Sequence, residues 1–327
     1  MKNSDEYFLG FDIGGTKCSI VIGDTEFFLH KKITFETKVE RGPFKIIEEF
    51  IFEVKKLFKH YDRHQLKGIG ISCGGPLDSK KGMIYSPPNL PGWDEIPIIE
   101  IFKKEFNVPV AVQNDANACA LAEWLMGAGK GTKNMVFLTF GTGMGAGLIL
   151  NNRLYSGTND LGGEVGDIRL ADDGPVGFGK AGSFEGFCSG GGIGRLAKSI
   201  VSEELNSGKT VGFCTSLDQL DKITPKAIFE AAIKGDPTAL QIVEISARHL
   251  GKGLAIIIDM LNPECIVIGS IYSRNEDLFG PVVQSVLKNE AIPSSLSVCR
   301  IVPAKLGENI GDYAALCVAL YDTLFES

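Results

Sequence analysis

The chain of 327 residues is long enough for two domains with separate cores, and its 44% apolar and 22% charged residues are typical of a globular protein. The net charge of −7 and the lack of any lysine or arginine block argue against a nucleic-acid-binding surface. No apolar run is long enough to span a bilayer, the run at residues 254–258 included, and the eight scattered cysteines have no C-x-x-C spacing. We therefore expect a cytoplasmic protein with buried free thiols and no nucleic-acid or membrane partner.

The first elements along the chain alternate strands with helices. Two strands around a glycine turn are expected at 7–22, followed by a strand at 27–37, a helix at 43–60, a buried strand at 67–75, a helix at 97–106 and a strand at 108–112. The proline and glycine content of residues 76–93 predicts a loop.

A strand–turn–strand unit over residues 134–157 repeats the pattern of residues 7–22. The repeat is weak as sequence, but two such units predict a duplicated architecture. Residues 160–194 are predicted to form a glycine-rich loop, and a loop of this length is more often functional than idle. The remaining expectations are helices at 114–127, 192–206, 224–235, 236–261, 277–289 and 311–325, with strands at 265–269 and 298–303.

Two glycine-rich turns, FDIGGTK at residues 11–17 and TFGTGMGAG at 139–147, each follow an apolar strand. Such turns direct backbone N–H groups and a threonine hydroxyl toward phosphate oxygens. The second is not a P-loop, since no G-K-[ST] follows, and not a Rossmann fingerprint, since a strand comes next instead of a helix. Either turn alone is also compatible with a plain hairpin, whereas the two together favour a phosphate clamp.

Carboxylates beside small residues are the other candidates. Asp115, in QNDANA, lies between a strand and a helix, where we expect it either to cap the helix or to serve as a base. Glu164, in GGEVGD, and Glu185, in SFEGF, either accept hydrogen bonds from the hydroxyls of a polyol or are ordinary solvated charges. The small turn at Gly269, after CIVI, suits a nucleoside lying against backbone.

Seven motifs in order, DIGGTK, CGGP, NDANACALAE, TFGTGMGAG, GGEVG, SFEGFCSG and LNPECIVIG, resemble the ROK family of repressors and sugar kinases over about residues 7–320. The resemblance implies an α/β protein with the two-domain actin-like ATPase (ribonuclease H-like) fold of the sugar kinases, and with a central cleft. It assigns residues 1–113 plus 311–327 to a smaller N-terminal domain and residues 114–310 to a larger C-terminal domain. It also implies a homodimer.

The same resemblance implies phosphoryl transfer from ATP, with Mg²⁺, to a sugar hydroxyl, and it makes Asp115 the catalytic base. The residues that it implies for sugar binding are Gly75, Asn114, Asp115, Glu164, Asp167 and Glu185. Those that it implies for ATP are Asp12, which orients magnesium through water, and Gly14, Gly15, Thr16, Lys17, Gly141, Thr142, Gly143 and Gly269.

The sequence departs from the family at a zinc site that many members have beside the sugar. The family's histidine position is Asp167 here, and the three cysteine positions are Val176, Phe178 and Ser183, so no ligand remains and we expect no zinc. Packing is expected to hold the loop instead, with the candidate anchors Val176, Phe178, Phe184 and Phe187. Asp167 is expected either to select a different hydroxyl pattern or an amino sugar, or to turn toward solvent or a lysine.

Phosphorylation of glucose on its 6-hydroxyl is the expected reaction, with N-acetylmannosamine, N-acetylglucosamine, fructose and allose as alternative acceptors. A sugar-binding regulator that has lost catalysis is the non-enzyme alternative. A repressor is not expected, because the eleven residues before Asp12 leave no room for a winged helix-turn-helix.

Overall fold

The computed structural model describes residues 6–325, which fall into two compact units. The first contains residues 6–133, 147–162 and 308–325, and the second contains residues 134–146 and 163–307. The second domain was expected to begin at residue 114. In the structure, helix α3 (Asp115–Leu125) instead belongs to the first unit. The reason is packing, because α3 rests against the C-terminal helix α11 (Ile310–Phe325), which also covers the first sheet.

The first unit is built on a five-stranded sheet in the order β3-β2-β1-β4-β7. Its strands are β1 (Tyr7–Ile13), β2 (Lys17–Gly23), β3 (Leu29–Glu36), β4 (Leu66–Cys73) and β7 (Val110–Asn114). The first three form an antiparallel meander, and β4 pairs in parallel with both β1 and β7. The expected loop after β4 also contains a short hairpin of β5 (Leu77–Asp78) and β6 (Met83–Ile84).

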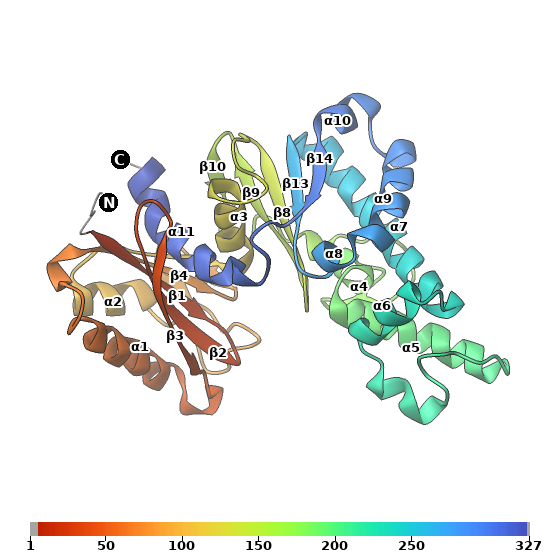
Figure 1. Ribbon diagram of the computed structural model, residues 1–327, viewed down its shortest axis with the longest axis horizontal. Coiled ribbons are helices and arrows are strands. Elements are labelled where there is room, and N and C mark those ends of the chain that lie inside the picture. The colour runs from red at the N-terminus through yellow and green to blue at the C-terminus, as the bar shows by residue number, and fades with distance from the viewer. Residues whose placement is uncertain (1–5, 326–327) are drawn as a thin grey trace. The chain divides into compact units, whose positions relative to one another are not determined.

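Helices cover both faces of this sheet (Figure 1). The apolar faces of α1 (Pro43–Leu57) and α2 (Ile98–Phe106) join the larger core, and α11 packs on the other face. Under α11, Gly10 and Gly70 lie opposite each other in the β1–β4 register. A Cβ built on Gly10 would lie 2.6 Å from Leu316 N, and one on Gly70 would lie 2.2 Å from Ala319 N. Only glycine allows the helix to approach the sheet this closely.

The second sheet repeats this strand order as β10-β9-β8-β13-β14. Its strands are β8 (Met135–Phe140), β9 (Met144–Leu150), β10 (Arg153–Tyr155), β13 (Cys265–Ile268) and β14 (Arg300–Pro303). β9 and β10 are antiparallel, and β13 pairs in parallel with both β8 and β14. The matching order confirms the duplicated architecture that the two glycine-turn units predicted.

The second unit contains β8, β13, β14 and the start of β9, and most of its other elements are helices. Its helices are α4 (Phe184–Phe187), α5 (Gly190–Asn206), α6 (Pro225–Ile233), α7 (Pro237–Leu261), α8 (Ile271–Arg274), α9 (Glu276–Glu290) and α10 (Pro293–Val298). Across residues 6–325, no helix combines the length and the apolar character needed to cross a membrane.

Two expectations for this unit were wrong. Residues 160–194 are not structureless, because they contain the hairpin of β11 (Val176–Gly177) and β12 (Lys180–Ala181), helix α4 and the start of α5. The strand expected from residue 298 begins only at Arg300, because Pro293 starts helix α10, whose last residue is Val298.

Candidate functional site

Four of the expected site residues lie at one edge of the first sheet. Asp12 is near the end of β1, Gly75 follows β4, and Asn114 ends β7 immediately before Asp115. The β4–β7 register pairs Cys73 with Asn114, so these strands end together. Parallel strands present their carboxyl ends at the same edge, which is where open α/β sheets bind ligands. The structure therefore gathers these four residues from three separate parts of the chain.

The hydrogen bonds at the start of α3 show which residue caps the helix, a role that was considered for Asp115 beside that of a base. Asn114 is the N-cap, and its side-chain oxygen accepts a 2.8 Å hydrogen bond from Asn117 N. Asp115 is the first helical residue, and its Oδ1 accepts a 2.8 Å hydrogen bond from Ala116 N. Its Oδ2 has no hydrogen-bond partner within residues 6–325, and the side chain is accessible to solvent. Because Asn114 caps the helix, the carboxylate of Asp115 is available for chemistry.

Asp12 and Asp115 are both harder to ionise than ordinary aspartates. Desolvation, followed by the charges of Asp312 and Asp115, raises the pKa of Asp12 from 3.8 to about 6. Desolvation also raises the pKa of Asp115, and the Ala116 N–H opposes the shift. Asp312 is ion-paired with Lys32, whose Nζ lies 2.7 Å from Oδ2, whereas Asp12 has no ion pair in the described part of the chain. The spot around Asp12 thus carries excess negative charge, which suits a divalent cation.

Residues 14–16 form the turn between β1 and β2, and Thr16 and Lys17, the first residue of β2, are exposed there. Thr37, which is fully buried, donates from Oγ1 to Gly14 O at 2.6 Å, and its backbone N–H donates to Thr16 O at 3.0 Å. Thr37 was not among the residues expected at the site. Thr37 follows β3, and only the pairing of β2 with β3 brings it to the turn, so no local pattern could have revealed it.

The second glycine turn lies between β8 and β9 and consists of Gly141, Thr142 and Gly143, with Thr142 exposed. Two contacts from later in the chain hold it. Gly190 N, at the start of α5, donates to Gly141 O at 2.8 Å. Met144 N, directly after the turn, donates to Glu185 Oε2 at 3.1 Å. The turn is therefore fixed by α4 and α5 as well as by its own strands.

Gly269, the residue expected to leave room for a nucleoside, lies close to this second turn. It follows β13, which pairs in parallel with β8, and its N–H donates to Leu138 O at 2.9 Å. The Oγ of the next residue, Ser270, would lie 3.6 Å from a Cβ built on Gly141. The second unit thus brings together Gly269 and the turn, and both have little side-chain bulk.

The three expected carboxylates of the second unit differ in their surroundings. The turn Val165–Asp167 packs against α4, and a Cβ built on Gly166 would lie 3.4 Å from Glu185 Cβ. Glu164 is exposed next to this turn. Asp167 faces a lysine, because Lys180 Nζ lies 2.7 Å from Asp167 Oδ2 and also donates to its backbone oxygen at 2.7 Å. Of the two alternatives for Asp167, the structure has the pairing with a lysine.

Packing anchors α4, which follows this loop, but through only two of the four expected residues. Phe184 is fully buried against Gly253, and Phe187 stacks on His249 with ring centroids 3.5 Å apart. Val176 and Phe178 were expected to be buried, and that expectation is wrong, since they are 45% and 62% exposed. The β11–β12 hairpin forms a sheet of its own, so its outward side chains have no further layer to pack against.

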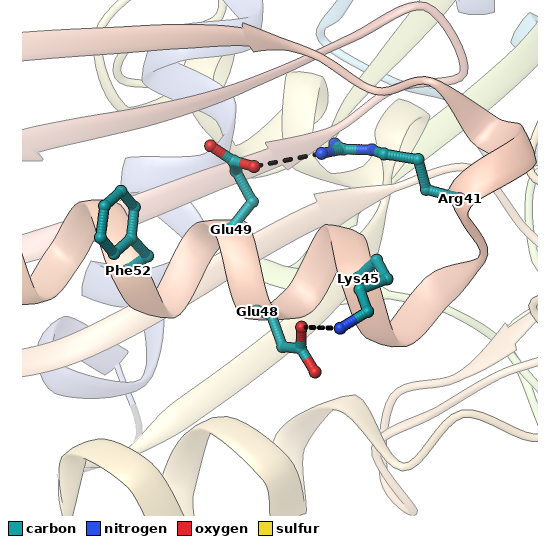
Figure 2. Close-up of a pocket in the computed structure, with 5 residues that line it drawn as sticks. All are labelled: Arg41, Lys45, Glu48, Glu49 and Phe52. Atoms are coloured by element: carbon teal, nitrogen blue, oxygen red, sulfur yellow. Dashed lines mark hydrogen bonds and ion pairs between the residues drawn. The ribbon is translucent and has the colours of Figure 1, made fainter.

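Within residues 6–325, no group of three or more histidine, cysteine, aspartate or glutamate side chains is arranged to hold a metal ion. A separate surface hollow lies along α1, and Figure 2 shows that it is lined by Arg41, Lys45, Glu48, Glu49 and Phe52. Arg41 pairs with Glu49 at 3.1 Å and Lys45 pairs with Glu48 at 2.7 Å. Because these four charged side chains form ion pairs with one another and no expected site residue lines the hollow, it is not a candidate for the functional site.

Comparison with known proteins identifies the family. The model of the ROK family matches residues 8–320. A glucokinase of Halalkalibacterium halodurans is 32% identical over 312 residues, which cover 94% of this chain and 93% of the relative. A ROK family glucokinase of Streptomyces griseus, solved in complex with glucose and AMPPNP, is 29% identical with a TM-score of 0.75, covering 96% of this chain and 99% of that chain. A xylose repressor of Caldicellulosiruptor bescii is 29% identical, covering 79% of this chain and 63% of the repressor.

The structural similarity and the two sheets of matching strand order confirm the actin-like ATPase fold. The family match extends from β1 into α11 and includes both glycine turns and Asp115. The chain therefore belongs to the ROK family.

Proposed function

We propose that the protein is an ATP-dependent sugar kinase that phosphorylates a hexose, with the 6-hydroxyl of glucose as the first candidate. The observation that carries the proposal is the carboxylate of Asp115. It lies at the ligand-binding edge of the first sheet, Asn114 caps the helix in its place, and Oδ2 has no partner within residues 6–325. Similarity to glucokinases over nearly the whole chain, one of them solved with glucose and AMPPNP, supports ATP and sugar as the ligands.

In the proposed reaction, Asp115 Oδ2 accepts the proton of the sugar hydroxyl while the hydroxyl oxygen attacks the γ-phosphorus of ATP. The new oxygen–phosphorus bond forms as the bond between the γ-phosphorus and the ADP oxygen breaks, and ADP leaves. The raised pKa of Asp115 makes it a stronger proton acceptor than an ordinary aspartate, provided that the solution pH stays above that pKa.

The two glycine turns are proposed to bind the phosphates of ATP. Their backbone N–H groups, the exposed hydroxyls of Thr16 and Thr142, and the ammonium of Lys17 are the donors available for this. Gly269 would leave room for the nucleoside. Asp12 would hold magnesium through water, and the ion would neutralise phosphate charge. The excess negative charge around Asp12 supports this assignment.

The sugar is proposed to contact Gly75, Asn114, Glu164 and Glu185. Gly75 has no side chain that would fill the space beside Asn114, since a Cβ built there would lie 4.0 Å from Asn114 Cβ. The Oδ1 of Asn114 is used by the helix cap, which leaves its Nδ2 as a donor to a sugar oxygen. Glutamates accept hydrogen bonds from hydroxyls, as a polyol requires.

An assay of ADP formation with glucose, mannose, fructose, allose, N-acetylglucosamine and N-acetylmannosamine tests the proposal. The wild-type protein should turn over at least one of these sugars. Asp115→Asn should lower kcat by about 10²- to 10⁴-fold, because the lost proton acceptor acts in the transition state, while the sugar Kd changes little. Asp221→Asn, which removes an exposed carboxylate paired with Lys198, is the matched control and should retain activity.

The same assay separates the alternatives. Turnover of an amino sugar or fructose in preference to glucose would replace glucose as the acceptor without changing the mechanism. Sugar binding without ADP formation in the wild type would refute the kinase and favour a sugar-binding regulator, a role that the relationship to a xylose repressor makes a reasonable second candidate.

A further inference from the structure

A loop that the sequence analysis did not assign to the site follows the β5–β6 hairpin. Residues 87–90 form one turn, closed by a 2.8 Å hydrogen bond from Leu90 N to Pro87 O. Residues 90–93 form the next, closed at 3.3 Å from Trp93 N to Leu90 O, with Gly92 at a φ of 80°. Each turn has proline at its second position, which presets the backbone angle there. Two turn hydrogen bonds and two prolines therefore restrain the backbone of this loop without a ligand.

Buried side chains anchor this loop to the first unit. Leu90 and Trp93 are both fully buried, and Trp93 O accepts a 2.8 Å hydrogen bond from Ser86 N. Asn89, which directly follows Pro88, is exposed instead. The structure thus fixes the backbone of Asn89 and leaves its side chain at the surface, which is the arrangement that a preorganised ligand contact requires.

Asn89 stands between two glycine pairs, Gly14–Gly15 and Gly74–Gly75, which include Gly14, Gly15 and Gly75 of the expected site. Its backbone oxygen would lie 2.5 Å from a Cβ built on Gly15, in the first phosphate turn. Its carboxamide faces the other pair, since a Cβ built on Gly74 would lie 3.0 Å from Asn89 Oδ1 and 3.6 Å from Nδ2. Gly75, proposed to contact the sugar, comes next in the chain. All these residues belong to the first unit.

The carboxamide of Asn89 forms no hydrogen bond with the described part of the chain. Neither Oδ1 nor Nδ2 has a hydrogen-bond partner within the described residues, although both atoms lie close to Gly74. An amide offers one acceptor and one donor group, and a sugar hydroxyl is itself both donor and acceptor, so the two match. An ionised phosphate only accepts hydrogen bonds, so it would pair with Nδ2 and leave Oδ1 without a donor.

We propose that the Asn89 carboxamide binds a hydroxyl of the acceptor sugar and helps to select which sugar is bound, while the Asn89 backbone supports the phosphate turn at Gly15. The proposal rests on the proposed kinase function for the identity of the ligand. It adds a specificity-determining residue from a loop that the motif analysis treated as a connection.

The test measures sugar binding separately from catalysis. Isothermal titration calorimetry without ATP gives the Kd of each of the six sugars for the full-length wild type and for Asn89→Ala, Asn89→Asp and Asn89→Ser. The Kd of AMPPNP and the melting temperature are measured for the same proteins. Asn206→Ala, at the exposed end of α5, is the matched control.

The expected result is a sugar Kd raised about tenfold or more in Asn89→Ala, with the AMPPNP Kd and the melting temperature unchanged. Asn89→Asp keeps an acceptor and loses the donor, so it should change the order of preference among the sugars. Asn89→Ser, which suits a turn, decides the matter if the alanine variant does not fold.

Two outcomes would overturn the proposal. One is a sugar Kd within twofold of wild type in a folded Asn89 variant. The other is an equal loss of sugar and AMPPNP affinity with a lower melting temperature, because that result would reduce Asn89 to a structural support. If the wild type binds a sugar but transfers no phosphoryl group, the kinase proposal fails while these Kd values still decide the role of Asn89. If it binds none of the sugars, both fail.

Discussion

Glu185 Oε2 lies 3.1 Å from Met144 N, so a carboxylate proposed to bind the sugar also holds the residue that follows the second phosphate turn. The contact is tight, because a Cβ built on Gly143 would lie only 2.9 Å from the same oxygen. Sugar and nucleotide affinity are therefore expected to depend on one side chain.

Replacing Glu185 in two ways separates these dependences. Glu185→Gln keeps an oxygen that can accept the Met144 N–H, so only the sugar KM should rise, by about tenfold. Glu185→Ala removes that acceptor as well, so the KM for ATP should rise too, because the turn is less well held. Steady-state kinetics with each substrate varied in turn checks this. Equal ATP KM values in the two variants would show that the hydrogen bond to Met144 does not support the turn.

Ionised Asp12 is expected to lower the stability of the folded protein although kinase activity requires it. Its pKa is about 6 in the folded protein and 3.8 in the unfolded chain, so the folded state binds the proton more tightly. Ionised Asp12 therefore destabilises the folded protein, by a penalty that grows from about pH 4 to about pH 6 and is constant above. Asp12→Asn should stabilise the metal-free protein by about 3 kcal/mol near pH 7 and abolish kinase activity.

Denaturant titrations at a series of pH values check this. The stability gain of Asp12→Asn over wild type should vanish below about pH 4, where Asp12 is protonated in both states. A gain that is the same at every pH would mean that the substitution acts through packing rather than through the charge.

Asp167 is expected to contribute little to sugar selection. Its carboxylate is bonded to Lys180, and the pair is solvent-accessible, so its loss should change the free energy of unfolding by no more than about 0.5 kcal/mol. Asp167→Asn should leave the ranking of the six sugars as it is in wild type. A changed ranking in the kinase assay would show instead that Asp167 reads a hydroxyl. Lys198→Met, which breaks a similar exposed pair elsewhere in the second unit, controls for the loss of an ion pair.

The same substitution should have opposite effects at two glycines. A Cβ on Gly70 would lie 2.2 Å from Ala319 N and 2.3 Å from Ala315 O, which are backbone atoms of α11 that cannot move aside cheaply. Gly70→Ala should therefore destabilise the protein by about 3 kcal/mol or more. Within residues 6–325, no atom beyond the neighbouring residues and the backbone of α5 lies within 4 Å of a Cβ position on Gly194, so Gly194→Ala should stabilise by up to about 1 kcal/mol. Urea unfolding of both variants provides the comparison.

Much of the secondary structure and the ligand-binding motifs could be predicted from sequence because their signals are local. The apolar periodicity of α1 and α7, and the glycines after β1 and β8, lie within short windows, and the structure has these elements where expected. The neighbours of Asp115 left it open between a helix cap and a base, and the resemblance to the ROK family favoured the base. Local pattern could not tell whether Asp115 or Asn114 caps α3, since both residue types are good caps.

Amino-acid order alone was sufficient to identify the family, the duplicated strand–turn–strand units and the candidate base, because each is recognised from short motifs of consecutive residues. The contacts that support these groups come from residues distant in sequence: Thr37 at the first turn, Glu185 at Met144, Asn89 between two glycine pairs, and α11 on Gly10 and Gly70. Only strand pairing and helix packing bring such residues together. The exposure of Val176 and Phe178 has the same origin, since burial depends on whether another layer of the fold covers a side chain and not on the side chain's own polarity.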